Sequence, residues 1–356
     1  MDITHHRLNN QKLLKTNFTK PVQVVEWLGA VQAQDYAGAK WAVAQRANGI
    51  TDAEMDEAFA EGAILRTHLL RPTWHFVSPA DIRWMLMLTA PRVRAISSFM
   101  YRQLELDKAV IKKSSAVLEK SLLGGKQLTR SELAAIFEKA GIVTSGLRMV
   151  YFMMSAELDG IICSGARKGK QFTYALLEER VPQVKALKLD EALAELVRRY
   201  FTSRGPATLQ DFMWWSGLTM TDAKNGIEMV KSEFMHEHMN GKAYWFPESK
   251  PPAKLKSPVA SLLPNYDEYF IGFKDRSAIG STTTWSNLGE SRSSPIAHIL
   301  FIDGQIVGGW RRIFKKNETI VELNILAKLS KAEQQAITTA GQEYSKFLGM
   351  PVKMTQ

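Results

Sequence analysis

The sequence has little of what a secreted or membrane protein needs. Cys163 is the only cysteine among its 356 residues, so no internal disulfide can form and a zinc site built on cysteines is excluded. No apolar run approaches the roughly 18 residues that a membrane span requires. The N-terminus has no apolar stretch behind a basic start, which would mark a secretory signal. These absences predict a cytoplasmic protein with no membrane partner.

Charge of one sign is not concentrated in any segment either. Lys and Arg total 46 against 36 Asp and Glu, a net charge of +10, and no basic tail accounts for the excess. A pI near 9.5 is compatible with a nucleic-acid partner, because each phosphate that a protein neutralises releases counterions. Proteins that bind no nucleic acid also have such values, so charge alone does not decide the partner.

Several motifs of enzyme chemistry are missing as well. No stretch resembles a Walker A loop, a dinucleotide-binding fingerprint or a Ser or Cys nucleophile elbow, so no cofactor is expected. His236 and His238 place two imidazoles on one face of a predicted strand. No cysteine or third ligand lies near them in the sequence, so we expect no metal site.

Residues 114–180 contain a distinct order of predicted elements. A helix with apolar periodicity ends at two glycines, and Thr129 with Glu132 then has the spacing of a capping box for a second helix. Ser145 is predicted to cap a third helix that ends near Glu157. A hairpin with a basic tip follows. Its two strands and its tip are predicted at residues 160–165, 171–175 and 167–170.

Residues 181–250 repeat this order. Thr208 is predicted to cap the second helix, and Thr219, with Asp222 at capping-box spacing, the third. Asn240-Gly241 then joins two predicted strands, and this dipeptide is a strong signal for a β-hairpin. Three short helices followed by a two-stranded hairpin are typical of a winged helix, whose third helix can enter a DNA major groove.

The two ends of the chain complete the prediction. The N-terminal part fits the winged-helix pattern more loosely, with a helix over Lys20–Val31, a capping box at Thr51 and Glu54 and a hairpin. The C-terminal part has alternating runs typical of a small antiparallel sheet and ends in an amphipathic helix. We therefore predict an α+β protein with three tandem winged-helix domains and a C-terminal β-rich domain closed by a helix. The predicted domains are residues 1–113, 114–180, 181–250 and 257–356.

Gln32-Ala33-Gln34-Asp35 follows the first predicted helix. Residues i and i+2 do not share a helix face, but in a transition segment the two glutamines could converge on one small polar site. Each amide both donates and accepts hydrogen bonds, so the pair could orient a water or hold a base edge. A polar helix end with exposed amides is the alternative.

Side chains suited to a DNA backbone occur at several predicted turns and tips. Arg66, Arg71, Thr73 and His75 lie on the N-terminal hairpin, where histidine and arginine could bind a phosphate or transfer a proton. A solvated polar surface is the alternative for each candidate. The remaining candidates for DNA binding are Arg148, Arg167, Lys168, Lys170, Arg311 and Arg312.

Several of these segments, in this order and spacing, resemble one bacterial family over nearly the whole chain. The segments are Gln32-Ala-Gln34 and residues 65–81, 262–267 and 307–312. The family is the winged-helix DNA-binding proteins that include the azinomycin-resistance and interstrand-crosslink DNA glycosylases. The alanine between the two glutamines stands where the family also has a bulkier apolar residue.

The resemblance implies a concave channel for double-stranded DNA, alkylated or crosslinked, and a monofunctional glycosylase without a lysine Schiff base. The family needs a Gln-x-Gln motif in that channel to excise alkylated bases, which carries over to Gln32 and Gln34 as catalytic residues. The family's Thr-x-His segment carries over to Thr73 and His75. No obligate protein partner is evident, and we expect the protein in the cytoplasm with the nucleoid.

The chemistry implied by the resemblance suits neutral amides. An alkylated purine is cationic and leaves as a neutral base, so the enzyme needs a placed water and stabilisation of the developing sugar cation more than it needs an acid. Two alternatives remain at this point. One is a non-catalytic DNA-binding or transcription-regulating protein that uses the third helix of each repeated segment. The other is a protein-interaction scaffold with no affinity for DNA.

Overall fold

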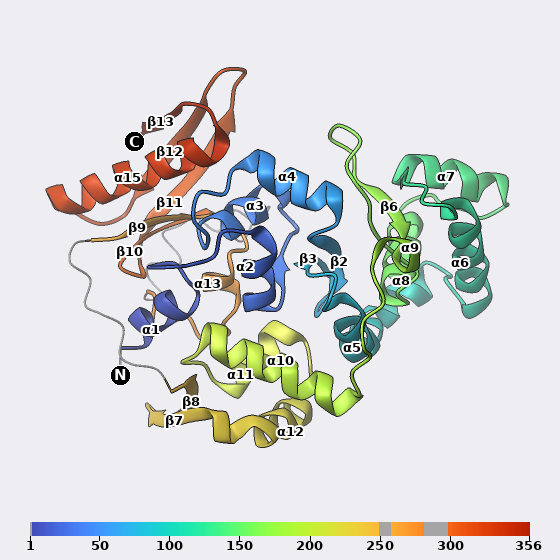
Figure 1. The fold of residues 1–356 in the computed structure, drawn as a ribbon, viewed down its shortest axis with the longest axis horizontal. Helices are drawn as coiled ribbons and strands as arrows, with labels where there is room; N and C mark the ends of the chain where they lie inside the picture. The colour runs from blue at the N-terminus through green and yellow to red at the C-terminus, as the bar shows by residue number, and fades with distance from the viewer. Residues whose placement is uncertain (1, 249–257, 281–297) are drawn as a thin grey trace.

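The computed structural model describes residues 2–248, 258–280 and 298–356, which form a mixed α+β protein, as the sequence predicts. One order of elements occurs in three consecutive parts of this described chain (Figure 1). It consists of a helix, a short extended segment, two further helices and a two-stranded hairpin. In each part the short segment pairs with the second strand of the hairpin. The three parts therefore share one topology.

The elements of these parts follow in chain order. The first part contains α2 (Pro21–Leu28), β1 (Val31–Gln32), α3 (Tyr36–Ala44), α4 (Asp52–Glu61), β2 (Leu65–Leu69) and β3 (Thr73–Val77). The second contains α6 (Lys108–Leu122), β4 (Leu128–Thr129), α7 (Arg130–Lys139), α8 (Arg148–Leu158), β5 (Ile162–Ser164) and β6 (Thr173–Leu176). The third contains α10 (Leu189–Arg204), α11 (Leu209–Ser216), α12 (Met220–Val230), β7 (Phe234–Met239) and β8 (Lys242–Pro247), with the bridge between Ala207 and Trp245 replacing the short strand. The connecting elements are α1 (Ile3–Asn10), α5 (Ile82–Gln103), α9 (Leu177–Arg180) and a 3₁₀ turn (Lys231–Glu233).

The predicted threonine caps are confirmed. Thr51, Thr129, Thr208 and Thr219 each accept a hydrogen bond from the backbone N–H three residues later, and the acidic residue at that position bonds back to the threonine N–H. Each reciprocal pair satisfies two amides that the first turn of a helix leaves free. These caps start α4, α7, α11 and α12 at the predicted residues.

Three boundaries differ from the prediction. The helix predicted over Lys20–Val31 ends at Leu28, because Gly29 has φ +76° and the chain then enters strand β1. The prediction that Ser145 caps the next helix is wrong, since α8 begins only at Arg148 and Leu147 stands at its N-cap. The domain boundary predicted between residues 113 and 114 falls inside α6.

In its described residues, the C-terminal part is a five-stranded sheet with a closing helix, as predicted for its helix and four of its strands. The elements are β9 (Ala260–Leu263), α13 (Glu268–Ile271), β10 (His298–Ile302), β11 (Gln305–Phe314), β12 (Thr319–Ile325), α15 (Lys331–Leu348) and β13 (Val352–Thr355). The strand order is β13-β12-β11-β10-β9. Strand β13 runs parallel to β12 and was not predicted.

The hydrophobic cores join segments that lie far apart in the sequence. One core contains Trp41 and Phe76 from the first part together with Trp310 and Tyr344 from the C-terminal sheet and helix. The Trp41 indole N–H donates to the carbonyl of Leu262, at 2.7 Å. Burial of aromatic side chains dominates the stability of such a core, so the first part and the C-terminal sheet pack as one unit.

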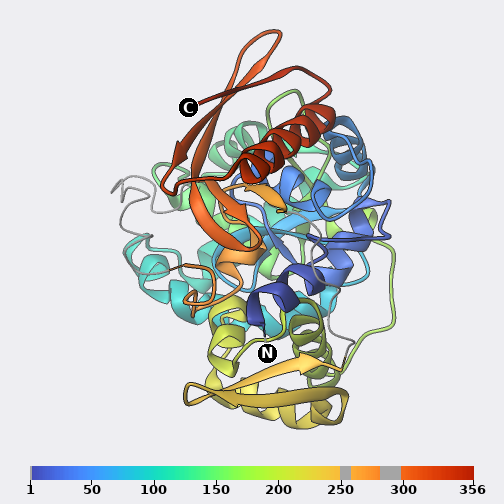
Figure 2. The same cartoon turned by 90° about the vertical axis from the view of Figure 1, so that its left-hand side faces the viewer.

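The figures show how the parts are arranged. In Figure 1 the second part lies at the right, away from the C-terminal sheet at the upper left, and the third part lies at the bottom. Figure 2 shows the C-terminal strands at the top and the β7–β8 hairpin at the bottom. Within the described ranges, no helix is long and apolar enough to cross a membrane.

Candidate active site

The two glutamines of the predicted motif meet at the end of strand β1. Gln32 pairs with His75 of β3 and is only 5% exposed, whereas Gln34 is exposed. The backbone N–H of Gln34 donates to the side-chain oxygen of Gln32, at 3.1 Å. This bond directs the Gln32 amide oxygen toward the backbone of Gln34, whose own side chain points to the surface.

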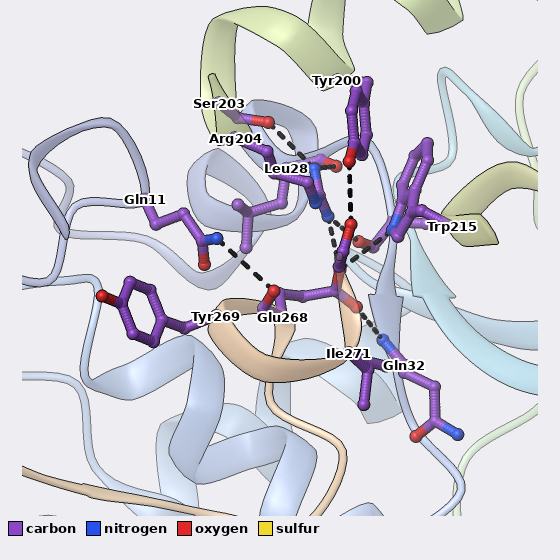
Figure 3. Close-up of polar contacts among 12 residues, drawn as sticks. Gln11, Leu28, Gln32, Tyr200, Ser203, Arg204, Trp215, Glu268, Tyr269 and Ile271 are labelled. Atoms are coloured by element: carbon purple, nitrogen blue, oxygen red, sulfur yellow. Dashed lines mark hydrogen bonds and ion pairs between the residues drawn. The ribbon is translucent and has the colours of Figure 1, made fainter. Parts of the chain in front are cut away.

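Contacts from three distant segments hold this short stretch in place. A carboxylate oxygen of Glu268 accepts from the backbone N–H of Gln32, at 2.9 Å (Figure 3). The Nε of Arg66 donates to the carbonyl of Ala33, at 3.0 Å. Arg312 forms an ion pair with Asp35, at 2.8 Å. The backbone on either side of the glutamines is therefore fixed by charged groups from β2, α13 and β11.

A cleft of about 360 Å³ lies beside this stretch. Gln34 and Asp35 line it on one side, and Arg167 and Phe172 from the predicted basic wing line it as well. Phe314 of β11, which is half exposed, completes the apolar part of the wall. Tyr36, Lys40, Asp52 and Tyr344 line it as well, so the structure brings an uncharged amide, cations, carboxylates and aromatic rings to one opening.

A second cleft of about 320 Å³ shares Phe172 with the first. Arg66, Arg130 and Lys170 line it, together with Trp74. Lys170 is exposed. Cations interleaved with aromatic rings are suited to phosphates and stacked bases, so the two clefts offer adjoining surfaces for nucleic acid.

Arg66 itself lies inside the protein rather than on its surface. It is 7% exposed, and its guanidinium lies 4.3 Å from the ring centre of Trp74 and 4.4 Å from that of Phe172. Burial lowers the pKa of Arg66 to about 10. An arginine that stacks on two rings and bonds a carbonyl is well placed to support the backbone of Ala33. Little of its guanidinium is exposed to contact a DNA phosphate.

His75 is also buried, with no exposed surface. Burial lowers its pKa well below the ordinary value, so the imidazole is neutral. Its Nδ1 lies 3.0 Å from the carbonyl of Thr73 and must carry the proton to donate to it. Within the described residues, four buried polar atoms of this hairpin have no hydrogen-bond partner. They are Thr67 Oγ1, Arg71 Nε, Thr73 Oγ1 and His75 Nε2.

Several other predicted cations already have partners within the chain. Lys168 pairs with Glu132 at 3.0 Å, and Arg311 pairs with Glu322. Arg148 donates to the backbone carbonyls of Val143 and Leu104, and lines neither cleft. Arg71 is half-buried, and burial lowers its pKa. Arg167 lines the first cleft but is half-buried, lies 3.8 Å from Asp56 and stacks on the rings of Tyr36 and Phe172. Of the predicted cations, Lys170 therefore has the most freedom to meet a phosphate.

The histidine pair on β7 is not part of any such cluster. His236 stacks on Trp245 with ring centres 4.9 Å apart, and His238 lies beside it. No group of three or more His, Cys, Asp or Glu side chains that could hold a metal occurs in the described segments of the chain.

Sequence reasoning missed the residue that contacts the first glutamine. Glu268 follows Asp267 directly in the sequence, and a strand at this place would point the two acids to opposite faces. The structure has helix α13 instead, with Asp267 as its N-cap. No local signal indicated that Glu268 reaches β1, because the two are 236 residues apart.

The chain is similar to known proteins over most of its length. The model of a family described as "DNA glycosylase AlkZ-like" matches residues 25–347, which is most of the chain. A curated relative, the interstrand DNA cross-link repair glycosylase of Streptomyces sahachiroi, is 25% identical over 335 residues, 85% of each chain. The structure of Streptomyces sahachiroi DNA glycosylase AlkZ matches 99% of this chain and 98% of its own with a TM-score of 0.79 and 20% identity. The two proteins share one fold.

Proposed function

The chain belongs to the AlkZ-like DNA glycosylase family and is a DNA-repair glycosylase, and from this premise we propose that it releases bulky N-alkylated purines or unhooks interstrand crosslinks, with Gln32 and Gln34 as its catalytic residues. The observation that carries the proposal is the hydrogen bond by which the backbone N–H of Gln34 holds the side-chain oxygen of Gln32, at 3.1 Å. The exposed side chain of Gln34 lines the cleft that Arg167 also lines.

The proposed mechanism uses the two amides for different tasks. The Gln32 oxygen is occupied by the Gln34 N–H, which leaves the Gln32 NH₂ group to donate. The Gln34 amide oxygen can hold a water or face the sugar cation as the glycosidic bond breaks. Amides are poor bases, but an alkylated purine leaves as a neutral base without help from an acid, so placement of the water is the main requirement.

An open surface suits a large lesion better than an enclosed pocket does. The two clefts adjoin at Phe172 and are lined by residues of the first part, the second part and the C-terminal sheet. An enzyme that extrudes one small base needs a closed pocket, whereas a crosslink keeps both strands at the site. We infer that the partner is double-stranded DNA and that Arg167 and Lys170 contact its phosphates. The protein would then act in the cytoplasm, on the nucleoid.

We further propose that the three repeated parts are winged-helix units. Their support is the common topology, in which the short strand pairs with the second strand of the hairpin. In the third part, α12 has exposed polar residues such as Lys224 and Asn225. In the second part, α8 is buried along most of its length, and its Glu157 is hydrogen-bonded to the His68 ring of β2.

The burial of α8 favours an enzyme over the alternative of a sequence-reading regulator. A reading helix must present polar side chains to base edges, and α8 presents mainly Arg148, which is bonded to the protein's own carbonyls. Family membership points the same way, because the family model describes DNA glycosylases. The scaffold alternative predicts no affinity for DNA, so a measured DNA affinity would distinguish this enzyme from an interaction scaffold.

A crosslinked duplex provides the test. A duplex crosslinked by nitrogen mustard is incubated with excess protein, and strand separation and abasic sites are followed on denaturing gels. We expect release by the wild type and a large loss of the single-turnover rate in Gln32→Ala and Gln34→Ala. Gln335→Ala, at an exposed position of α15, is the matched control and should react normally. Absence of abasic sites with the wild type, or unchanged rates in both variants, would refute the proposal.

A further inference from the structure

We propose that Glu268 is a positioning residue for the glycosylase reaction, because its buried carboxylate fixes the backbone of Gln32 and thereby the pair of amides. The proposal rests on the catalytic role proposed above for Gln32 and Gln34. In Figure 3 the backbone N–H of Gln32 faces Glu268, while the Gln32 side chain extends away from it. Glu268 therefore contacts the backbone that carries the amide and does not contact the amide itself.

The first argument is the geometry of β1. This two-residue strand is an edge strand in the described part of its sheet, where it pairs only with β3. The next residue, Ala33, donates its N–H to Trp74 of β3, at 2.7 Å. Successive N–H groups of a strand point to opposite edges, so the N–H of Gln32 points away from β3. The Glu268 carboxylate accepts from that N–H at 2.9 Å, as a backbone carbonyl of a neighbouring strand would do.

The second argument is how firmly the carboxylate is held. Its other oxygen accepts from the indole N–H of Trp215 at 2.9 Å and from Arg204 at 2.6 Å. All three side chains are fully buried. A buried carboxylate that loses its partners is strongly destabilising, so Glu268 has one position in the folded protein. That position fixes where the Gln32 N–H must lie.

The third argument is that Arg204 acts on the same stretch of chain. Besides Glu268 it donates to the carbonyls of Leu28, at 2.7 Å, and Ala30, at 3.3 Å. Between these carbonyls lies Gly29, whose φ of +76° turns the chain from α2 into β1. Both members of the buried ion pair thus bond the backbone that leads into Gln32. The pair joins that backbone to α10 and α13, and Trp215 adds α11.

The expected consequence is a defect in rate and not in DNA affinity. A short edge strand has few ladder bonds to hold it, and a small displacement of a catalytic group lowers the rate steeply. Glu268→Gln has one acceptor oxygen fewer, so an NH₂ group must face either the Gln32 N–H or the donors of Arg204 and Trp215. We expect the single-turnover rate to fall by about tenfold or more, with DNA affinity within about twofold.

The neighbouring buried ion pair provides a matched control. Asp267 is fully buried like Glu268 and bonds Arg46 through two nitrogens, at 2.8 and 2.7 Å. Asp267 makes no hydrogen bond to β1, and asparagine, like aspartate, can cap the helix α13 that carries Glu268. Asp267→Asn therefore loses a comparable buried charge and stability, but its folded fraction should keep the wild-type rate. An equal loss of rate in Asp267→Asn and Glu268→Gln would overturn the proposal.

A double-mutant cycle separates a positioning role from a structural one. If Glu268 acts through Gln32, then Glu268→Gln should slow Gln32→Ala by less than about twofold, although it slows the wild type by about tenfold. Equal slowing in both backgrounds would contradict the proposal. If Gln32→Ala and Gln34→Ala leave the rate unchanged, the proposed function itself fails, whatever Glu268→Gln does.

A milder variant covers the case in which Glu268→Gln does not fold. Trp215→Phe removes one donor to the carboxylate and keeps its charge. It should raise the hydrogen-exchange rate of the Gln32 N–H and lower base release by about threefold, with DNA affinity unchanged. A folded Trp215→Phe protein with faster exchange at Gln32 and a wild-type rate would show that this contact does not position the amides.

Discussion

The guanidinium of Arg312 lies 2.9 and 2.8 Å from the two carboxylate oxygens of Asp35, the residue that follows Gln34. Asp35 also accepts from the N–H of Gly38, at 3.1 Å, and so caps α3. A residue of the C-terminal sheet therefore fixes one end of the glutamine segment, while Glu268 bonds its start. This arrangement links the C-terminal part to the candidate active site.

Removal of that link should affect both stability and rate. Arg312 is largely buried, so Arg312→Leu loses a charge-assisted bond of about 2 kcal/mol and releases Asp35 beside Gln34. We expect a lower free energy of unfolding in urea and slower base release. Arg311→Leu removes the neighbouring arginine, whose ion pair with Glu322 is exposed, and should leave stability nearly unchanged. Equal destabilisation by the two variants would contradict this assignment.

Salt dependence should separate buried from exposed cations. Lys170 is exposed and lines a cleft, so Lys170→Ala should lower the slope of log Kd against log salt by about 0.9. Arg66 is buried between Trp74 and Phe172, and Arg66→Met should leave the slope unchanged while it lowers stability and base release. Fluorescence anisotropy with a labelled duplex measures both slopes. A loss of slope in Arg66→Met equal to that in Lys170→Ala would show that Arg66 reaches a phosphate.

Acid should destabilise the protein in part through His75. Burial holds the pKa of His75 well below its ordinary value, so the folded protein keeps this imidazole neutral as pH falls. The unfolded chain binds the proton near its ordinary pKa of about 6.5 and is favoured below that pH. Between about pH 7 and about pH 5.5 this group should lower the free energy of unfolding by about 1 kcal/mol.

His75→Asn is the variant that checks the pH prediction. The amide NH₂ of asparagine can replace the Nδ1–H that bonds the Thr73 carbonyl, and asparagine does not titrate. The variant is expected to be less stable than the wild type at neutral pH but to lose less stability on acidification. Urea unfolding at the two pH values gives the difference. An identical pH dependence in the variant would mean that another group is responsible.

Gly217 should tolerate no side chain. It ends α11 with φ +72°, and a Cβ there would lie 2.4 Å from the carbonyl oxygen of Leu70. Gly217→Ala should therefore cost about 3 kcal/mol of stability, from left-handed strain and a backbone clash. Gly241 has φ +73° and open space around it, so Gly241→Ala should cost only the strain, about 1 kcal/mol. Similar losses in both variants would show that the contact with Leu70 is unimportant.

The elements that the sequence predicted well are those that depend on local chemistry. The caps at Thr129, Thr208 and Thr219 require only a carboxylate three residues later, and the Asn240-Gly241 turn requires only two residues. Strand β1 could not be predicted in this way. It has two residues, and its partners are β3 and Glu268.

The candidate site shows the same difference between features set by local sequence and features set by tertiary contacts. Gln32 and Gln34 could be selected from their motif and from the family resemblance, but the burial of Arg66 and His75 could not, because it depends on rings and strands from other segments. Glu268 could not be selected either, because its contact with β1 spans 236 residues. Local patterns thus predict where a helix starts, whereas the support of a short strand by distant charges follows only from the tertiary structure.

The central claim is that the amides of Gln32 and Gln34 act at the sugar of a damaged nucleotide. The most direct measurement is a crystal structure of the protein bound to a duplex that carries the abasic product. We predict that the Gln34 amide lies within hydrogen-bonding reach of the deoxyribose C1′ position, directly or through one water, with Gln32 still bonded to the Gln34 N–H. A complex with the abasic sugar elsewhere on the protein and both amides out of such reach would contradict the claim.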